Sequence, residues 1–312
     1  MSAREYLPGE EGTIRNYEQL PVSMNRIESL CHEMVKTLNR ANRNGRLSQG
    51  LLTKLKEVGQ IFFDELFPLS IKEKLNATKA TTLKIDLTDQ LVHIPWELIH
   101  NGEGFLCNRF NMGRMVKTQQ RVFGGHPRDL SSPLKAIILA DPEGDLKGAY
   151  GEGTQIRDAM DENREAVNAT LRTGNIQSDF VRKKIRDYDI IHFAGHAHYD
   201  EEHPEKSGWQ LSGDAFKAED VIKMAGSATR AMPALIFSNA CQSARTEKWI
   251  LSNRFQDQIF GLANAFLLAG VKHYVGTFWE ILDEPSSYFA LAFYQHLPTR
   301  WRDHAGGQAC HY

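Results

Sequence analysis

Apolar residues in the first part of the chain recur at every third or fourth position. This spacing runs through residues 21–44 and again through residues 51–66, and it is typical of helices that bury one face. Asn44-Gly45 marks the end of the first stretch, and Pro68 lies just beyond the second. The pattern predicts an antiparallel pair of helices whose apolar faces pack against the rest of the protein.

After residue 80 the spacing changes to an alternating one. Leu83, Ile85 and Leu87 are separated by polar residues, which predicts a strand. Residues 91–99 continue as mixed strand or turn, and Asn101–Gly104 carries a strong turn signal. We therefore expect a small β-containing region after the helical pair.

A segment rich in glycine, proline and polar residues, 121–133, indicates a linker into a second unit. Beyond it, buried strands are expected at 135–140, 189–194, 234–238 and 273–278, and helices at 152–167, 179–188, 219–225, 254–269 and 285–297. Apolar strands that alternate with helices indicate a mostly parallel sheet with helices on both faces. The expected division is a helical segment (1–80), a β-containing part (81–130), an α/β core (131–297) and an irregular tail (298–312).

Composition narrows the class of protein. Of the 312 residues, 41% are hydrophobic and 24% are charged, which is ordinary for a globular protein. The net charge of -2 argues against direct binding of nucleic acid. No apolar run approaches the roughly 18–20 residues of a membrane helix, and the N-terminus lacks the apolar stretch of a signal peptide. The four cysteines are scattered without a CxxC pair, so we expect a cytoplasmic protein without a disulfide framework.

Two strand ends carry reactive side chains. The strand 189–194 runs into Gly195 and His196, and the strand 234–238 runs into Asn239, Ala240 and Cys241. Active residues of parallel sheets lie at the carboxyl edge, so these two would face each other if their strands are near neighbours. A thiolate beside an imidazole can attack a carbonyl, with the imidazole protonating the leaving amine. Backbone N–H groups of Cys241 and of Ala197 could stabilise the oxyanion.

These motifs resemble a known family. Asp189-x-Ile-His-Phe-Ala-Gly-His-Ala is followed by Ser-Asn-Ala-Cys-Gln-Ser-Ala around Cys241, and Ile94-Pro95-Trp96-Glu97-Leu98 lies upstream. Together they resemble the CHAT branch of the caspase-like cysteine peptidases, over about 83–297. The resemblance implies a caspase-haemoglobinase fold and hydrolysis of specific protein substrates, with Cys241 as nucleophile, His196 as general acid and base, and no cofactor.

The resemblance also implies regulation. Similar CHAT proteins usually act with sensor modules or regulatory partner proteins, often in bacterial defence or programmed cell death. No recognisable sensor is present in this sequence, and the helical pair at 21–67 is a candidate docking surface.

The substrate pocket is less defined. In relatives that cleave after basic residues, an acidic residue lies two places before the cysteine, where this chain has Asn239. Asp141, at the end of the first core strand, could supply a carboxylate instead, and Trp279, Glu280 and Asp283 are further candidates for the pocket. A basic and an uncharged P1 residue both remain open.

Two other functions compete with the peptidase. A catalytically silent caspase-like scaffold would use the same fold for binding alone. A metal-dependent hydrolase would use the histidines at 192, 196, 198 and 203, although the strand pattern and Gly195 do not give helical metal-ligand spacing. His192, inside a strand, is instead expected to be a hydrogen-bonded core residue, and Asp189 is expected to cap or end a turn.

Overall fold

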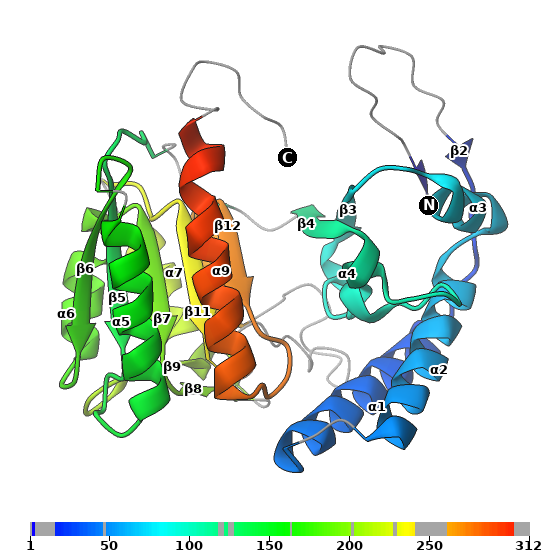
Figure 1. The fold of residues 1–312 in the computed structure, drawn as a ribbon, viewed down its shortest axis with the longest axis horizontal. Helices are drawn as coiled ribbons and strands as arrows, with labels where there is room; N and C mark the ends of the chain where they lie inside the picture. The colour runs from blue at the N-terminus through cyan, green and yellow to red at the C-terminus, as the bar shows by residue number, and fades with distance from the viewer. Residues whose placement is uncertain are drawn as a thin grey trace. The chain divides into compact units, whose positions relative to one another are not determined.

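The structure is a computed structural model that describes residues 2–3, 16–45, 48–117, 122–123, 128–162, 164–200, 203–226, 230–240 and 261–302. The chain divides into two units, Met1–Thr118 and Gln119–Tyr312, each with its own core (Figure 1). No helix among the described residues combines the length and the apolar character needed to cross a membrane.

The first unit is mainly helical. Its elements are β1 (Ser2–Ala3), β2 (Asn16–Tyr17), α1 (Met24–Arg43), α2 (Gln49–Leu66), α3 (Leu69–Ala77), β3 (Thr82–Thr88), η1 (Asp89–Leu91), η2 (Trp96–Leu98), α4 (Leu106–Arg109) and β4 (Asn111–Lys117). The two long helices and the strand expected from the periodicity are confirmed, whereas the short helix α3 was not expected.

Helices α1 and α2 pack antiparallel, as the sequence predicts. Arg26 near the start of α1 pairs with Glu65 near the end of α2 at 2.6 Å, and Lys54 pairs with Glu33 at 2.9 Å. Their apolar faces enter the core of the unit, which also contains Trp96 and other side chains of the β-containing part. Burial of this face therefore stabilises the unit itself.

Strands β3 and β4 form a two-stranded parallel pair. Between them, the stretch that could have been strand or turn contains the turns η1 and η2. Trp96 is 1% exposed and its indole N–H donates to the carbonyl of Leu91 at 2.9 Å. Glu97 accepts two hydrogen bonds from the Arg114 guanidinium, which joins η2 to β4. The residues of the upstream motif therefore act in packing.

The second unit is an α/β sandwich of helices and sheet. Its elements are β5 (Leu134–Ala140), α5 (Lys147–Asp161), β6 (Val167–Thr173), α6 (Ser178–Lys184), η3 (Ile185–Asp187), β7 (Ile190–Ala194), β8 (Ala197–His198), η4 (Pro204–Lys206), β9 (Gly208–Gln210), β10 (Ala215–Lys217), α7 (Ala218–Gly226), β11 (Leu235–Asn239), α8 (Leu262–Leu268), β12 (His273–Gly276) and α9 (Asp283–Arg302).

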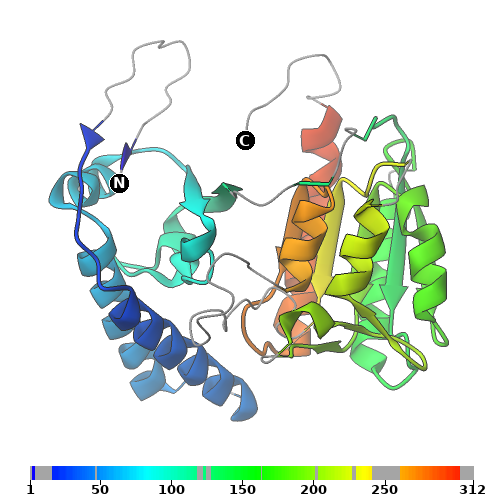
Figure 2. The same cartoon turned by 180° about the vertical axis from the view of Figure 1, so that it is seen from behind.

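The five-stranded sheet has the order β12–β11–β7–β5–β6, and every neighbouring pair is parallel. Alternate residues of β5 enter different cores: Ile138 packs with side chains of α5 and α9, and Ile137 packs with side chains of α6, α7 and α8. Figures 1 and 2 show these helices on opposite faces. The predicted fold class, a mostly parallel sheet flanked by helices on both faces, is confirmed.

Asp189 organises the amino ends of two strands. Its carboxylate pairs with Arg128 and accepts the backbone N–H of Lys135, the second residue of β5, at 2.7 Å. The Arg128 guanidinium also donates to the carbonyls of Arg186 and Ala231. Asp189 directly precedes β7, so it does more than end a turn, the role expected for it. It fixes the amino ends of the strands, at the edge of the sheet opposite to the one where His196 follows β7.

Several boundaries differ from the expectation. The helix expected over 152–167 ends at Asp161, because Val167 already belongs to β6, and no strand was expected there. Helix α9 continues to Arg302, so residues 298–302 are helical rather than irregular. Residues 254–260 and 303–312 lie outside the described part.

His93 links the stability of the first unit to pH. Its side chain is 8% exposed, and burial, together with the positive charge of Arg114, lowers its pKa from 6.5 to about 4. The folded unit favours the neutral ring, whereas the unfolded chain binds a proton already near pH 6.5. The contribution of the neutral His93 ring to the unfolding free energy is therefore complete above pH 6.5, and it is lost as the pH falls from 6.5 toward 4.

We expect the first unit to lose about 3 kcal/mol of unfolding free energy through His93 as the solution is acidified across this range. Calorimetry of the whole protein at several pH values should show that His93→Gln removes most of this dependence. His32→Gln, at an exposed position of α1, is the matched control and should keep it. An unchanged pH dependence in His93→Gln would contradict the assignment.

Candidate functional site

The strand that leads to His196 lies next to the strand that leads to Cys241. Strands β7 and β11 are parallel neighbours, and Ala194 is paired with Asn239 at their carboxyl ends. His196 follows Ala194 by two residues, and Cys241 follows Asn239 by two residues. The condition set by the sequence, that the two strands are near neighbours, is therefore met, and the described ends of β7 and β11 lie at the same edge of the sheet.

Cys241 itself lies outside the described residues, but the chain is described up to Ala240. Ala240 is 3% exposed, and its carbonyl accepts a hydrogen bond from the Thr277 hydroxyl at 2.6 Å. This contact joins the end of β11 to the segment after β12. The residue directly before Cys241 is thus held by a hydrogen bond from the residue that follows β12.

His196 is half-exposed, with 48% of its side chain accessible. Its carbonyl accepts the N–H of Gln210 at 2.9 Å, which fixes the backbone against β9. On the side-chain end, Nε2 lies 3.3 Å from the Asp145 carboxylate, on the segment between β5 and α5. Asp145 could not be identified from the sequence, because nothing in the local pattern relates it to a histidine about fifty residues away.

The backbone N–H of Ala197 points away from the strand beside it. Ala197 is paired with Trp209 in the antiparallel sheet β10–β9–β8, and the bond from Gln210 N–H to the His196 carbonyl makes this a non-hydrogen-bonded pair. Strand β8 is an edge strand of that sheet. The orientation fits a donor to an oxyanion, which the sequence analysis assigned to Ala197 and Cys241.

A buried polar network lies beneath the strand ends. The Glu152 carboxylate, on α5, is 2.8 Å from Nε2 of His192, and Asn239 donates to both of its oxygens at 2.8 and 2.7 Å. Ser287, on α9, donates to it at 2.6 Å. His192 contacts the Tyr294 hydroxyl at 3.2 Å through its other ring nitrogen. One carboxylate thus joins α5, β7, β11 and α9.

The network fixes the charge of Glu152. Burial alone would raise the pKa of its carboxyl, but the hydrogen bonds from His192, Ser287 and Asn239 hold the pKa below its ordinary value. Burial and the neighbouring Glu152 charge raise the pKa of Tyr294 well above its ordinary value. A buried ionised carboxylate is stable only when several donors surround it, and this one has them.

The residues expected to bind substrate lie in three places. Asp141 is 8% exposed, and its carboxylate accepts the N–H of Leu146 at 2.8 Å. Asn239 is half-buried, with its amide N–H₂ directed at Glu152 and at Ser286, 3.2 Å away. Three others follow β12: Trp279, Glu280 and Asp283. Trp279 and Glu280 are half-buried, and the side chain of Asp283 lies outside the described part.

His192 is a core residue, as expected. Its side chain is fully buried and both ring nitrogens contact protein partners. Among the residues that the structure describes, no group of three or more His, Cys, Asp or Glu side chains is arranged to hold a metal ion.

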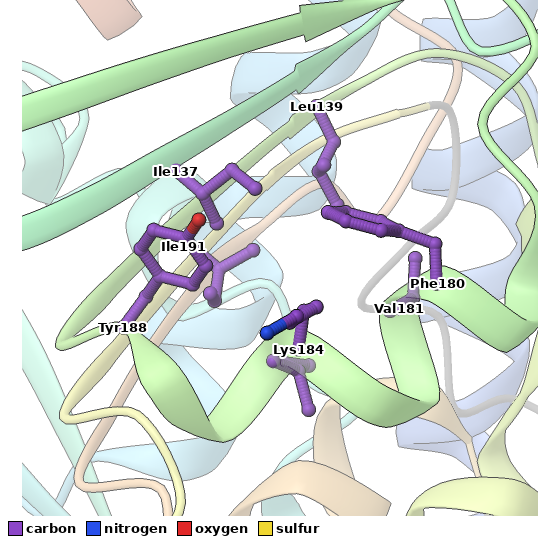
Figure 3. A pocket seen from close by; sticks show the side chains of 8 residues that line it. Ile137, Leu139, Phe180, Val181, Lys184, Tyr188 and Ile191 are labelled. Atoms are coloured by element: carbon purple, nitrogen blue, oxygen red, sulfur yellow. The ribbon is translucent and has the colours of Figure 1, made fainter.

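A cavity on the sheet face lies between α6 and strands β5 and β7 (Figure 3). Six apolar side chains line it, together with Lys184 and Tyr188: Ile137, Leu139, Phe180, Val181, Ile185 and Ile191. Nearly all of its lining belongs to the apolar core on that face. It is a feature of packing, separate from the strand ends that carry the reactive residues.

Comparison with known proteins agrees with the motifs. The family model described as CHAT domain matches residues 56–309, so the match begins earlier than the resemblance seen in the sequence and includes part of α2. The crystal structure of the Saccharomyces cerevisiae separase–securin complex contains a similar chain, with a TM-score of 0.33, 14% identity, and coverage of 50% of this chain and 9% of that chain. No curated protein matches significantly.

We expect Glu152→Ala to remove about 3–5 kcal/mol of unfolding free energy, because the buried His192 and the half-buried Asn239 and Ser287 lose their acceptor. Urea unfolding followed by the fluorescence of Trp209 and the other tryptophans would measure this. Glu162→Ala, at the exposed end of α5, is the control and should change stability by less than about 0.5 kcal/mol.

The loss of unfolding free energy on substitution of Glu152 should also depend on pH. Because the pKa of Glu152 is lowered in the folded protein, its contribution is present above 4.5 and is lost as the pH falls below that value. The difference between the wild type and Glu152→Gln should therefore shrink in acid. A loss below about 1 kcal/mol for Glu152→Ala at neutral pH would contradict the network.

Proposed function

The chain belongs to the CHAT domain family, and from that premise we propose that it is a cysteine endopeptidase in which Cys241 and His196 cleave peptide bonds of specific protein substrates. The observation that carries the proposal is the parallel pairing of Ala194 with Asn239, two residues before His196 and two residues before Cys241 along the chain. A thiol and an imidazole at one sheet edge are the groups that acyl transfer through a thioester requires.

In this mechanism the Cys241 thiolate attacks the carbonyl carbon of the scissile bond, and negative charge develops on the carbonyl oxygen. The N–H groups of Ala197 and Cys241 stabilise this charge. The C–N bond then breaks as the His196 imidazolium gives its proton to the leaving amine. The neutral imidazole next takes a proton from water, whose oxygen attacks the thioester and releases the acid and the thiol.

We propose that substrate side chains bind beside the ends of β5, β11 and β12. Asn239 is neutral and its donors are directed at Glu152, so its amide oxygen is the group it has left to offer a substrate. Asp141, Trp279, Glu280 and Asp283 are the other candidate contacts. Both a basic and an uncharged P1 residue are compatible with this set.

We also propose that activity is controlled by a regulatory protein or sensor module, in bacterial defence or cell-death signalling. The helical pair is the candidate docking surface, but its apolar faces already pack inside the first unit. Docking would therefore use exposed charged positions of α1 such as Lys36 and Arg40. Reversing the charge at these two positions should impair activation without unfolding the unit, whereas deleting the helices would expose its core.

The peptidase assignment can be tested with a proteome-derived peptide library and mass spectrometry. Wild-type protein should cleave a defined set of peptides, which also reports the P1 residue. Cys241→Ala and His196→Ala should each reduce cleavage by at least about 10³-fold, because the nucleophile and its proton donor act as a unit.

Cys107→Ser is the matched control for the thiol. Cys107 is a free cysteine on the surface. Surrounding protein atoms remove part of the water around its thiol, and this desolvation, together with the Glu97 carboxylate, raises the pKa of the thiol, so it is a poor nucleophile. Its substitution should leave cleavage unchanged. Cleavage that persists in Cys241→Ala would overturn the proposal, and a wild type that binds peptides without cleaving them would favour the scaffold.

A further inference from the structure

Asp145 is the one acidic side chain in hydrogen-bonding distance of His196 among the described residues. Its Oδ2 lies 3.3 Å from His196 Nε2. The side chains of His196 and Asp145 are 48% and 58% exposed, so the contact contributes little to folding. Any role of this contact in catalysis would therefore come from its effect on the orientation of the His196 ring.

The backbone that carries Asp145 is fixed by Asp141. Asp141 has a φ of 49°, in the left-handed region, and its carboxylate accepts the N–H of Leu146, the residue after Asp145. Its carbonyl accepts N–H groups of Gly144 at 3.2 Å and Gly174 at 3.0 Å. An aspartate tolerates this strained conformation better than most residues, and three hydrogen bonds stabilise it here.

The same residue joins this segment to the strand of His196. The N–H of Asp141 donates to the carbonyl of Ala194, the last residue of β7, at 2.9 Å. Between Ala194 and His196, a Cβ on Gly195 would lie 2.9 Å from Cδ of Pro142, so the two segments are in direct contact. The carboxylate and the imidazole therefore project from two backbones that are tied together.

We propose that Asp145 is a positioning residue for His196, and this inference rests on the proposed function. The Nε2–H group of His196 donates to the Asp145 carboxylate, which leaves Nδ1 as the nitrogen that exchanges a proton with Cys241 and with the leaving amine. The same hydrogen bond holds the ring in one orientation while that proton is exchanged. Asp145 exchanges no proton itself, and the proton on Nδ1 is the one that the leaving amine receives.

The test follows the alkylation of Cys241 by iodoacetamide, measured by mass spectrometry of the peptide that contains it. This readout reports the thiolate and needs no knowledge of the substrate. His196→Ala sets the lower limit of the rate. We expect Asp145→Ala and Asp145→Asn to slow alkylation by roughly three- to tenfold, and Asp145→Glu to restore most of the rate.

Glu143→Gln is the matched control, because Glu143 is an exposed acid of the same segment. This substitution removes the same charge without touching His196, so Cys241 should be alkylated at the rate of the wild type. Once a cleaved peptide is known, Asp145→Asn should lower kcat with little change in KM, since the residue does not contact the substrate. Unchanged melting temperatures would show that the variants remain folded.

Three outcomes would overturn the inference. If His196→Ala slows alkylation but Asp145→Ala does not, the contact has no role, and the peptidase proposal stands. If Glu143→Gln slows the reaction as much as Asp145→Asn, the effect is the general charge of the segment. If His196→Ala leaves Cys241 reactivity unchanged, the pairing of thiol and imidazole fails, and the proposed function fails with it.

Discussion

Parallel pairing between β7 and β11 is the constraint on which the site depends. In a parallel ladder, residues at matching heights leave the sheet at the same edge, so pairing Ala194 with Asn239 aligns two segments that are far apart in the sequence. A register shifted by one residue would also turn every side chain of one strand to the opposite face. The apolar cores on the two faces, which contain alternate residues of β7, oppose any such shift.

A buried histidine in the sheet stabilises the same edge. His192 occupies a position of β7 that is otherwise surrounded by apolar side chains, and it is satisfied by Glu152 and Tyr294. The carboxylate of Glu152 reaches onward to Asn239, so the two central strands are joined through side chains as well as through the backbone ladder. The Thr277 hydroxyl adds a link between the end of β11 and the segment after β12, at Ala240.

Much of the fold was predictable because periodicity reports burial. The continuous apolar strands β5, β7 and β11 are buried on both faces, and α1 and α2 have one apolar stripe each. Strand β6 was missed although Val167, Ala169 and Leu171 alternate with polar residues, because the preceding helix was extended too far. Strands β8, β9 and β10 have only two or three residues, which is too short for any period to appear.

The candidate site was only partly predictable for a different reason. His196 was identifiable because a reactive side chain directly follows a buried strand. Glu152 left a fainter signal, since it shares a helical face with the buried residues Ile156 and Met160. Asp145 left none, because its relation to His196 exists only through the hydrogen bonds of Asp141 with the backbone of neighbouring strands.

The buried carboxylate of Glu152 also has an evolutionary consequence. Its donors come from separate elements, so a substitution at one of these positions leaves polar atoms at the others without their partners around a buried carboxylate. Single changes within this set are therefore selected against, whereas compensated changes are tolerated. Among related sequences, positions 152, 192 and 239 should vary together, as one inherited unit, even while the residues around the substrate diverge.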